Sequence, residues 1–189
     1  MKRTIGTIVA SSAMAMMAPR PALADQTYLR ESEAPRALFP ESTGSGQKTL
    51  ELSDAELHAL SRKLERQIEL RRYKYLEVSN QAGTLGSIFV LDVIGQSQPI
   101  TFAVGVAKDG SVRDLQVMVY REPHGEEVRE ARFRRQFNGK RLSDPLVLGK
   151  DIDAISGATI SSRSAAYATR KALALAEILH GRTAAAGAK

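Results

Sequence analysis

The sequence of 189 residues contains no cysteine and no tryptophan, and it has only three histidines. The absence of cysteine excludes disulfides, thiolate metal sites, thioether-linked haem and cysteine-ligated iron–sulfur clusters. The histidines, His58, His124 and His180, are not spaced as metal ligands are. No metal site is therefore expected, and any cofactor would be held by other chemistry.

Catalytic constellations are missing as well. The sequence shows no nucleophile–base–acid triad, no pair of carboxylates placed for acid–base work and no metal cluster. We therefore predict no catalytic residues, and an autonomous enzyme is disfavoured.

A clean basic face is also missing, although the formal net charge is +6. Lys2, Arg3 and Arg20 lie in the N-terminal segment, and the rest of the chain carries +3. The remaining excess falls in residues 121–141, where glutamates alternate with arginines. Nucleic-acid-binding modules more often carry a uniform basic face with interleaved aromatics, so no nucleic-acid partner is predicted.

No apolar run is long enough to span a bilayer, but residues 1–24 have the organisation of a secretory signal peptide. Lys2 and Arg3 precede an apolar stretch over residues 4–18, which is shorter than the roughly 18–20 residues of a membrane span. Ala22-Leu23-Ala24 is an A-x-A cleavage site. We expect a periplasmic or extracytoplasmic protein, with an uncleaved leader that keeps it at the membrane as the alternative.

The chain after the leader has the length of one domain. Residues 25–48 are predicted to be an extended entry segment because they are rich in Pro, Gly and Ser and lack a clear period; Leu38 and Phe39 would pin it to the core. A single domain is expected over residues 49–182, followed by a frayed tail over residues 183–189.

Hydrophobic spacing and turn signals predict an α+β fold, with an antiparallel sheet flanked by an N-terminal and a C-terminal helix. A capping box at Ser53 and Glu56 opens a helix over about residues 54–70. Alternating apolar residues and turns then predict four strands, a short helix and a long final helix. Their expected bounds are 73–78, 86–94, 99–107 and 111–120 for the strands, and 126–137 and 162–179 for the helices.

The segment Asp153-Ala-Ile-Ser-Gly-Ala-Thr159 lies just before the last predicted helix. The free N–H groups and the dipole of a helix start favour a phosphate, and Gly157 allows the backbone to approach one closely. The alternative is purely structural, with Ser161 or Ser162 as the N-cap and Gly157 as a turn residue.

The same segment carries a resemblance to a known family. The pattern D-x-x-[ST]-G-A-[ST] is met by Asp153, Ser156, Gly157, Ala158 and Thr159. On this pattern the chain resembles the FMN-binding domain family, which includes the flavoprotein subunits of the sodium-pumping NADH:quinone oxidoreductase and of the Rnf complex. The segment also stands where that family has it, before a C-terminal helix, and the resemblance extends over about residues 73–180.

The resemblance implies that Thr159 carries FMN through a phosphoester bond, installed by a flavin transferase that uses FAD and a divalent metal. Ser156, Gly157 and Ala158 would then be small so that the transferase reaches the hydroxyl. Asp153 has three open roles: it orients the acceptor, binds the transferase's metal, or satisfies local backbone donors.

Further flavin contacts are expected from the loop that begins at Glu122, and from an aromatic side chain. The loop reads Glu-Pro-His-Gly, where the better-known subunits have a Glu-Thr-Pro-Gly type, which leaves its contacts open. Without tryptophan, the candidates for stacking on the ring are Tyr120, Phe133, Phe137 and Tyr167. Glu122 and Tyr120 are the two that we predict to bind the cofactor.

Three functional hypotheses follow. The first is an exported electron-transfer protein with FMN on Thr159, which relays electrons between a membrane oxidoreductase and an extracytoplasmic acceptor. The second is a module that binds FMN or another phosphate ligand noncovalently and has no redox role. The third is a secreted interaction protein without a cofactor, which docks a partner through its mixed-charge segment.

Overall fold

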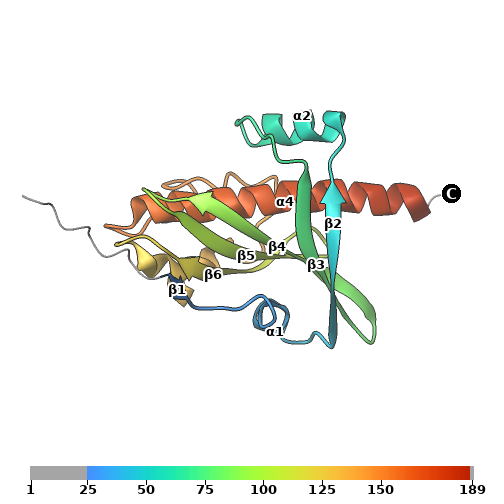
Figure 1. Ribbon diagram of the computed structural model, residues 1–189, viewed down its shortest axis with the longest axis horizontal. Helices are drawn as coiled ribbons and strands as arrows, with labels where there is room; N and C mark the ends of the chain where they lie inside the picture. Colours follow the sequence, from blue (N-terminus) through green and yellow to red (C-terminus); the bar gives the residue numbers. More distant parts are fainter. Residues whose placement is uncertain (1–24, 188–189) are drawn as a thin grey trace, which may run out of the picture.

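The computed structural model describes residues 25–187 and contains a six-stranded, wholly antiparallel sheet with the strand order β1-β6-β5-β4-β3-β2 (Figure 1). The strands are β1 (Gln26–Thr27), β2 (Gly44–Glu51), β3 (Arg72–Asn80), β4 (Gly83–Ile94), β5 (Pro99–Ala107) and β6 (Val112–Tyr120). The four predicted strands are present as β3 to β6, within a few residues of their expected bounds. The predicted α+β class is therefore confirmed.

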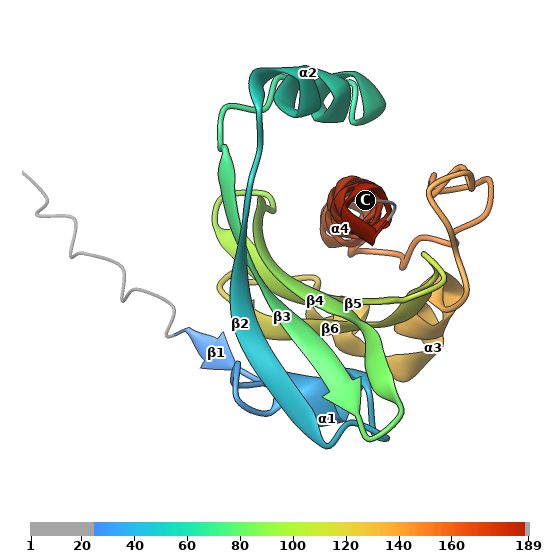
Figure 2. The ribbon, with the colours of Figure 1, turned by 90° about the vertical axis from the view of Figure 1, so that its right-hand side faces the viewer.

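Helices cover both faces of the sheet. They are α1 (Ala34–Leu38), α2 (Asp54–Lys63), α3 (Ala131–Arg134) and α4 (Thr159–Gly187), with the 3₁₀ turns η1 (Glu126–Arg129) and η2 (Arg135–Phe137) on either side of α3. Figure 2 looks along α4 and shows the sheet curving around this helix. In this view α2 lies above α4, and α1 lies on the opposite, convex side of the sheet. Within residues 25–187, no helix combines the length and the apolar character that crossing a membrane requires.

Alternation along the strands decides which side chains meet α4. On β5, Ile100, Phe102, Val104 and Val106 lie in the main core together with the alanine-rich face of α4. The intervening Ala103 faces the convex side, where it shares a smaller cluster with α1 and its flanking residue. Leu38 and Phe39 are both 1% exposed in that cluster, so they do pin the entry segment to the core.

The entry segment is more ordered than its composition suggests. Besides α1, it contains β1 and most of β2, and β2 pairs with β3 along its whole length, from Gly44 opposite Ser79 to Glu51 opposite Arg72. Only Leu50 is buried in β2, so this edge strand lacks the alternating pattern that reveals the other strands. The predicted signal peptide, residues 1–24, lies outside the described residues.

The predicted helix over residues 54–70 is wrong at its C-terminal end. The capping box at Ser53 and Glu56 is present, but α2 stops at Lys63 and Glu65 adopts a left-handed backbone with φ 50°. Ile68 continues the apolar spacing and is buried, yet its N–H donates to the Ser61 hydroxyl 3.1 Å away. Ile68 is therefore apolar because it is buried in the core beyond the end of α2, and not because it continues the helix.

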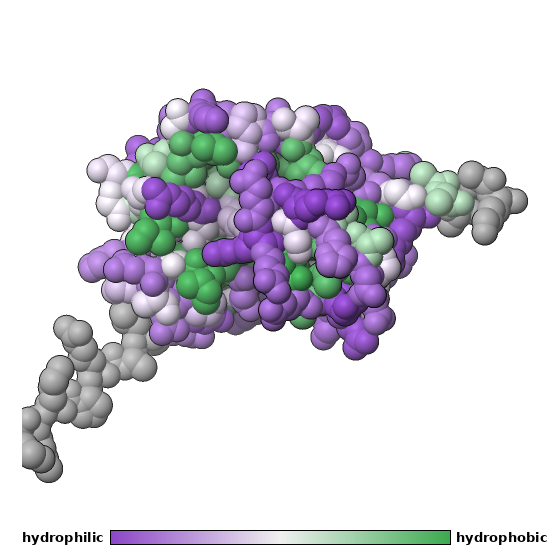
Figure 3. All heavy atoms as spheres, turned by 90° about the horizontal axis from the view of Figure 1, so that it is seen from above, coloured by the Kyte–Doolittle hydropathy of each residue, from purple (hydrophilic) through white to green (hydrophobic). Residues whose placement is uncertain are grey.

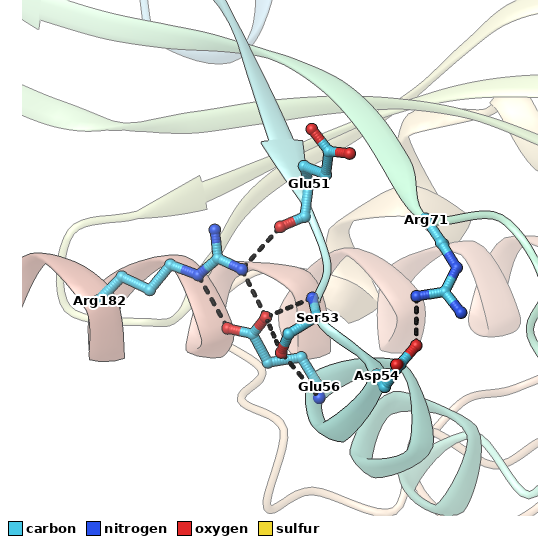
Figure 4. A network of polar contacts seen from close by, with 6 residues as sticks. All are labelled: Glu51, Ser53, Asp54, Glu56, Arg71 and Arg182. Atoms are coloured by element: carbon cyan, nitrogen blue, oxygen red, sulfur yellow. Dashed lines mark hydrogen bonds and ion pairs between the residues drawn. The ribbon is translucent and has the colours of Figure 1, made fainter.

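The last helix is longer than predicted at both ends. It begins at Thr159 rather than Ser162, and it continues to Gly187, beyond the expected end at residue 179. Arg182 holds the C-terminal part of α4 in place, because its guanidinium donates to the Glu51 carbonyl at 2.7 Å and to both carboxylate oxygens of Glu56 (Figure 4). Alanine is the strongest helix former, so the run after Thr183 supports the extension.

Candidate functional site

The segment that precedes α4 is a tight turn that ends on the helix. The Ala158 N–H donates to the Ile155 carbonyl over 3.0 Å, and Gly157 within this turn has φ 82°. A β-carbon at Gly157 would meet nothing within 4 Å, so glycine is required there by backbone conformation and not by crowding. Ser156 and Gly157 are exposed, which leaves the surface beside them open.

Thr159 is the first residue of α4, and its side chain is exposed. The residue before it is Ala158, whose carbonyl accepts the Ser162 N–H at 2.8 Å but whose side chain offers no capping oxygen. Within the described chain, no side chain or loop carbonyl accepts the N–H groups of Thr159, Ile160 or Ser161. The helix start therefore presents free donors and partial positive charge next to the Thr159 hydroxyl.

The alternative in which Ser161 or Ser162 caps the helix is wrong, because both residues lie within its first turn. The Ser162 hydroxyl donates to the Ala158 carbonyl at 2.9 Å and accepts the Ile155 N–H at 3.3 Å. This contact fixes the turn against the helix. In the part of the chain that the structure describes, no serine side chain caps the start of α4.

The loop that begins at Glu122 packs against the first turn of α4. The hydroxyl of Tyr120 donates to the His124 carbonyl at 2.6 Å and lies 2.8 Å from the Ser161 hydroxyl. Gly125 has φ 96°, and a β-carbon there would come within 2.6 Å of the Ser161 oxygen. The structure therefore brings together two segments that the resemblance assigned to one site.

Burial raises the pKa of Tyr120 above its ordinary value, although the Ser161 hydrogen bond acts in the opposite direction. The side chain is 2% exposed, and it stays a neutral hydrogen-bonding group at physiological pH. Tyr120 thus ties the loop to the helix, and its contact with a flavin stays a prediction.

Glu122 is turned toward the connection between β4 and β5. Its carboxylate accepts the backbone N–H groups of Ser97 and Gln98 at 2.6 and 2.9 Å, and the Ser97 hydroxyl at 2.9 Å. Burial opposes ionisation of this group, but the hydrogen bonds outweigh it and the pKa of Glu122 is lowered. In this structure Glu122 fixes a turn, and its flavin contact, too, stays a prediction.

Asp153 has its backbone held and its side chain free. The Gln136 side chain accepts the Asp153 N–H at 2.7 Å and donates to the Asp153 carbonyl at 3.2 Å. Within residues 25–187 no donor reaches the Asp153 carboxylate, so of its three open roles the local backbone one has no support. Sequence reasoning missed Gln136, because nothing in its own neighbourhood marks a partner 17 residues away.

A cleft of about 540 Å³ borders the same segment. Its lining consists of Arg132, Phe133, Gln136 and the four residues from Asp153 to Ser156. This volume lies within the roughly 300–1,000 Å³ typical of small-molecule sites. The cleft offers an arginine and, close by, a free helix start, so its residues fit a phosphorylated cofactor. Phe133 reaches the wall but is only 1% exposed, so it offers little surface for stacking.

The other aromatic candidates lie elsewhere. Phe137 is buried and packs edge-to-face on Phe133, with ring centroids 5.4 Å apart. Tyr167 lies on another side of α4, under the Arg66 guanidinium at 5.1 Å. Of the four candidates for stacking, only Phe133 lines the cleft. In the described residues, no group of three or more His, Asp or Glu side chains could hold a metal ion.

Comparison with known proteins agrees with this geometry. Residues 95–174 match the family model described as the FMN-binding domain. The fold resembles a solved structure of NqrC from Shewanella oneidensis, with a TM-score of 0.50 and 18% identity over 71% of this chain and 80% of that chain. No curated protein matches the sequence.

Proposed function

We propose that this chain is an electron-transfer protein that carries FMN on the Thr159 hydroxyl. The match of residues 95–174 to the FMN-binding domain family supports the proposal. The observation that carries the proposal is the exposure of Thr159 at the uncapped start of α4, within the family's attachment pattern. A phosphate at that oxygen would meet the free N–H groups of the first turn.

Attachment would be carried out by a flavin transferase with FAD as donor. The Thr159 oxygen forms a bond to the phosphorus of the FMN half, the pyrophosphate bond breaks, AMP leaves and the hydroxyl proton is lost. Within this chain, the small residues Ser156, Gly157 and Ala158 keep the acceptor accessible. Thr159 is a modification site in this account and not a catalytic nucleophile.

The chain's own residues would bind and orient the group. The helix start would hold the phosphate, and the cleft bordered by Arg132 and Gln136 is where we propose that the flavin ring would lie. Tyr120 and Gly125 keep the neighbouring loop pressed on α4. Bound FMN supplies the ability to accept and donate electrons, while the protein supplies placement and electrostatics.

Covalent attachment suits an exported protein. A dissociated cofactor would be diluted outside the cytoplasm, whereas a tether keeps its local concentration in the millimolar range even if intrinsic binding is weak. The proposed location is periplasmic or extracytoplasmic, and the proposed partner is a membrane-bound oxidoreductase. The predicted leader and the resemblance to subunits of membrane complexes support both.

In-gel fluorescence after co-expression with a flavin transferase tests the attachment. The wild-type band should fluoresce after denaturation and Thr159→Ala should be dark, while Thr159→Ser, which keeps the pattern, should retain fluorescence. Ser161→Ala is the matched control, because it removes a neighbouring hydroxyl and leaves the acceptor. A dark wild-type band, or equal fluorescence in Thr159→Ala, would refute the attachment, and flavin released on denaturation would favour the noncovalent module.

A further inference from the structure

A groove of about 310 Å³ lies beside the first two turns of α4, away from the cleft described above. We call it the α4 groove. It is lined by Leu64, Glu65, Arg66, Val93, Ile94, Ile160, Arg163, Ser164 and Tyr167. A second hollow of about 420 Å³ shares Leu64, Arg163 and Tyr167 with it and extends it along α4 to Arg170.

Most of the large apolar side chains that are exposed in the described residues line this groove. Three such side chains are exposed in the described residues, and two of them, Ile94 at 66% and Ile160 at 42%, line the groove. Ile160 directly follows Thr159, and Ser164 fixes Ile94 beside α4 because its hydroxyl donates to the Ile94 carbonyl at 2.9 Å. An exposed apolar pair thus lies next to the proposed flavin attachment.

The charge around this pair is mainly positive. The charged residues of the groove and its extension are three arginines, Arg66, Arg163 and Arg170, against the single acid Glu65. Among the ion pairs of residues 25–187, none involves any of these four. Arg163 stands one helical turn after Thr159, on the same side of α4. An approaching surface would therefore be matched in charge by carboxylates.

The apolar area is small. Figure 3 shows the side of the molecule that carries α2, where hydrophobic residues form separate areas between hydrophilic ones. Permanent interfaces need large continuous apolar areas, whereas electron-transfer encounters use interfaces below about 1,200 Å² and gain speed from charge complementarity. A brief encounter fits this surface better than a permanent one.

We propose that the α4 groove is the docking surface for an acidic one-electron carrier protein that exchanges electrons with the flavin at Thr159. This inference rests on the proposed function and adds the partner's chemistry. Two encounters would reoxidise the two-electron-reduced flavin, each passing one electron to the partner, with two protons released to water. Ile94 and Ile160 would supply the dry centre of contact, and Arg66 and Arg163 the steering charge.

Docking can be tested on the flavin-free protein by NMR. A plant-type ferredoxin, an acidic one-electron carrier, is titrated into the isotope-labelled protein at low salt, and cytochrome c, a basic carrier, serves as the opposite probe. We expect ferredoxin to perturb the amides around Ile94 and from Ile160 to Tyr167, and the effect to vanish at high salt. Cytochrome c should leave these amides unchanged.

Charge reversal gives the matched variants. Arg163→Glu should weaken ferredoxin binding at least tenfold, while Arg36→Glu, an equal change at an exposed position of α1 on the convex face, should leave it within twofold. Equal effects of the two variants, perturbation mapped elsewhere, or no ferredoxin binding at low salt would overturn the proposal. So would binding to phosphatidylserine vesicles in place of ferredoxin, which would assign this face to a membrane. Failure of flavin attachment would instead show as missing in-gel fluorescence in the wild type.

Discussion

At Gly125 a backbone requirement and a packing requirement coincide. The residue has φ 96°, and a β-carbon would lie 2.6 Å from the Ser161 oxygen and 2.9 Å from the Tyr120 oxygen. A left-handed conformation costs a non-glycine residue about 1–2 kcal/mol, and overpacking adds about 1–3 kcal/mol. The identity of one loop residue thus decides whether the loop can sit on α4.

Gly125→Ala is therefore predicted to lower the free energy of unfolding by about 2–5 kcal/mol, measured by urea denaturation. Gly139→Ala is the control, because Gly139 has φ 76° and nothing within 4 Å of its β-carbon position. It should cost only the backbone part, about 1–2 kcal/mol. Equal losses in the two variants would show that the contact with Ser161 and Tyr120 does not constrain the loop.

Tyr120→Phe isolates the hydroxyl in the same contact. The variant keeps the buried ring but removes the hydrogen bond to the His124 carbonyl and the contact with Ser161. We predict a loss of about 0.5–1.5 kcal/mol, because one part-buried hydrogen bond is removed. Hydrogen exchange should show faster exchange in residues 122–125, and unchanged exchange there would refute the role of the hydroxyl.

At the scale of the elements, the segment before α4 depends on a side chain from η2. Gln136 both accepts from and donates to the backbone of Asp153, so it fixes where the turn before α4 begins. The Ser162 hydroxyl fixes the other end of the turn. The turn is therefore anchored on both sides, while Ser156, Gly157 and Thr159 remain exposed.

Gln136→Ala is predicted to cost only about 0.5–1.5 kcal/mol in stability, because both hydrogen bonds are exposed, and to slow flavin attachment several-fold. The measurement is the rate of in-gel fluorescence increase with transferase and FAD. Gln47→Ala, at an exposed position on β2, should change neither quantity. An attachment rate equal to wild type in Gln136→Ala would mean that the turn needs no anchor at Asp153.

Local signals predicted much of this arrangement. The capping box, the alternation on β5 between the two core clusters and the turn between β5 and β6 depend on neighbouring residues, and the structure confirms them. The pattern in residues 153–159 was likewise read from neighbouring residues. What escaped prediction depends on distant partners: the pairing of β2 with β3, the Gln136 contact, and the burial of Ile68 beyond the end of α2.

At the scale of the molecule, α4 runs from the candidate site to contacts with α2 and β2. Its first residue is Thr159, and near its C-terminal end Arg182 binds Glu56 of α2 and the Glu51 carbonyl at the end of β2 (Figure 4). The Arg182 hydrogen bond is the main cause that lowers the pKa of Glu56 to about 2, from an ordinary value of 4.5. The carboxylate is thus much more acidic in the folded state than in the unfolded chain.

This shift predicts a pH dependence of stability. Because the folded pKa lies below the ordinary one, the stabilising contribution of Glu56 is present above pH 4.5 and is lost as the pH falls toward 2. Glu56→Gln should flatten the decline of the melting temperature over that range, measured by circular dichroism. Glu51→Gln is the control, since both side chains of its 3.5 Å pair with Arg72 are about two-thirds exposed. Identical pH profiles for wild type and Glu56→Gln would contradict the assignment.

The central claim is that the whole fold presents one oxygen, that of Thr159, for modification. Mass spectrometry after co-expression with a flavin transferase tests it most directly. We predict an intact mass increased by FMN minus one water, and fragmentation of the tryptic peptide Asp151–Arg163 should place the added mass on Thr159. An unmodified mass, or the addition on Ser156, Ser161 or Ser162, would contradict the account.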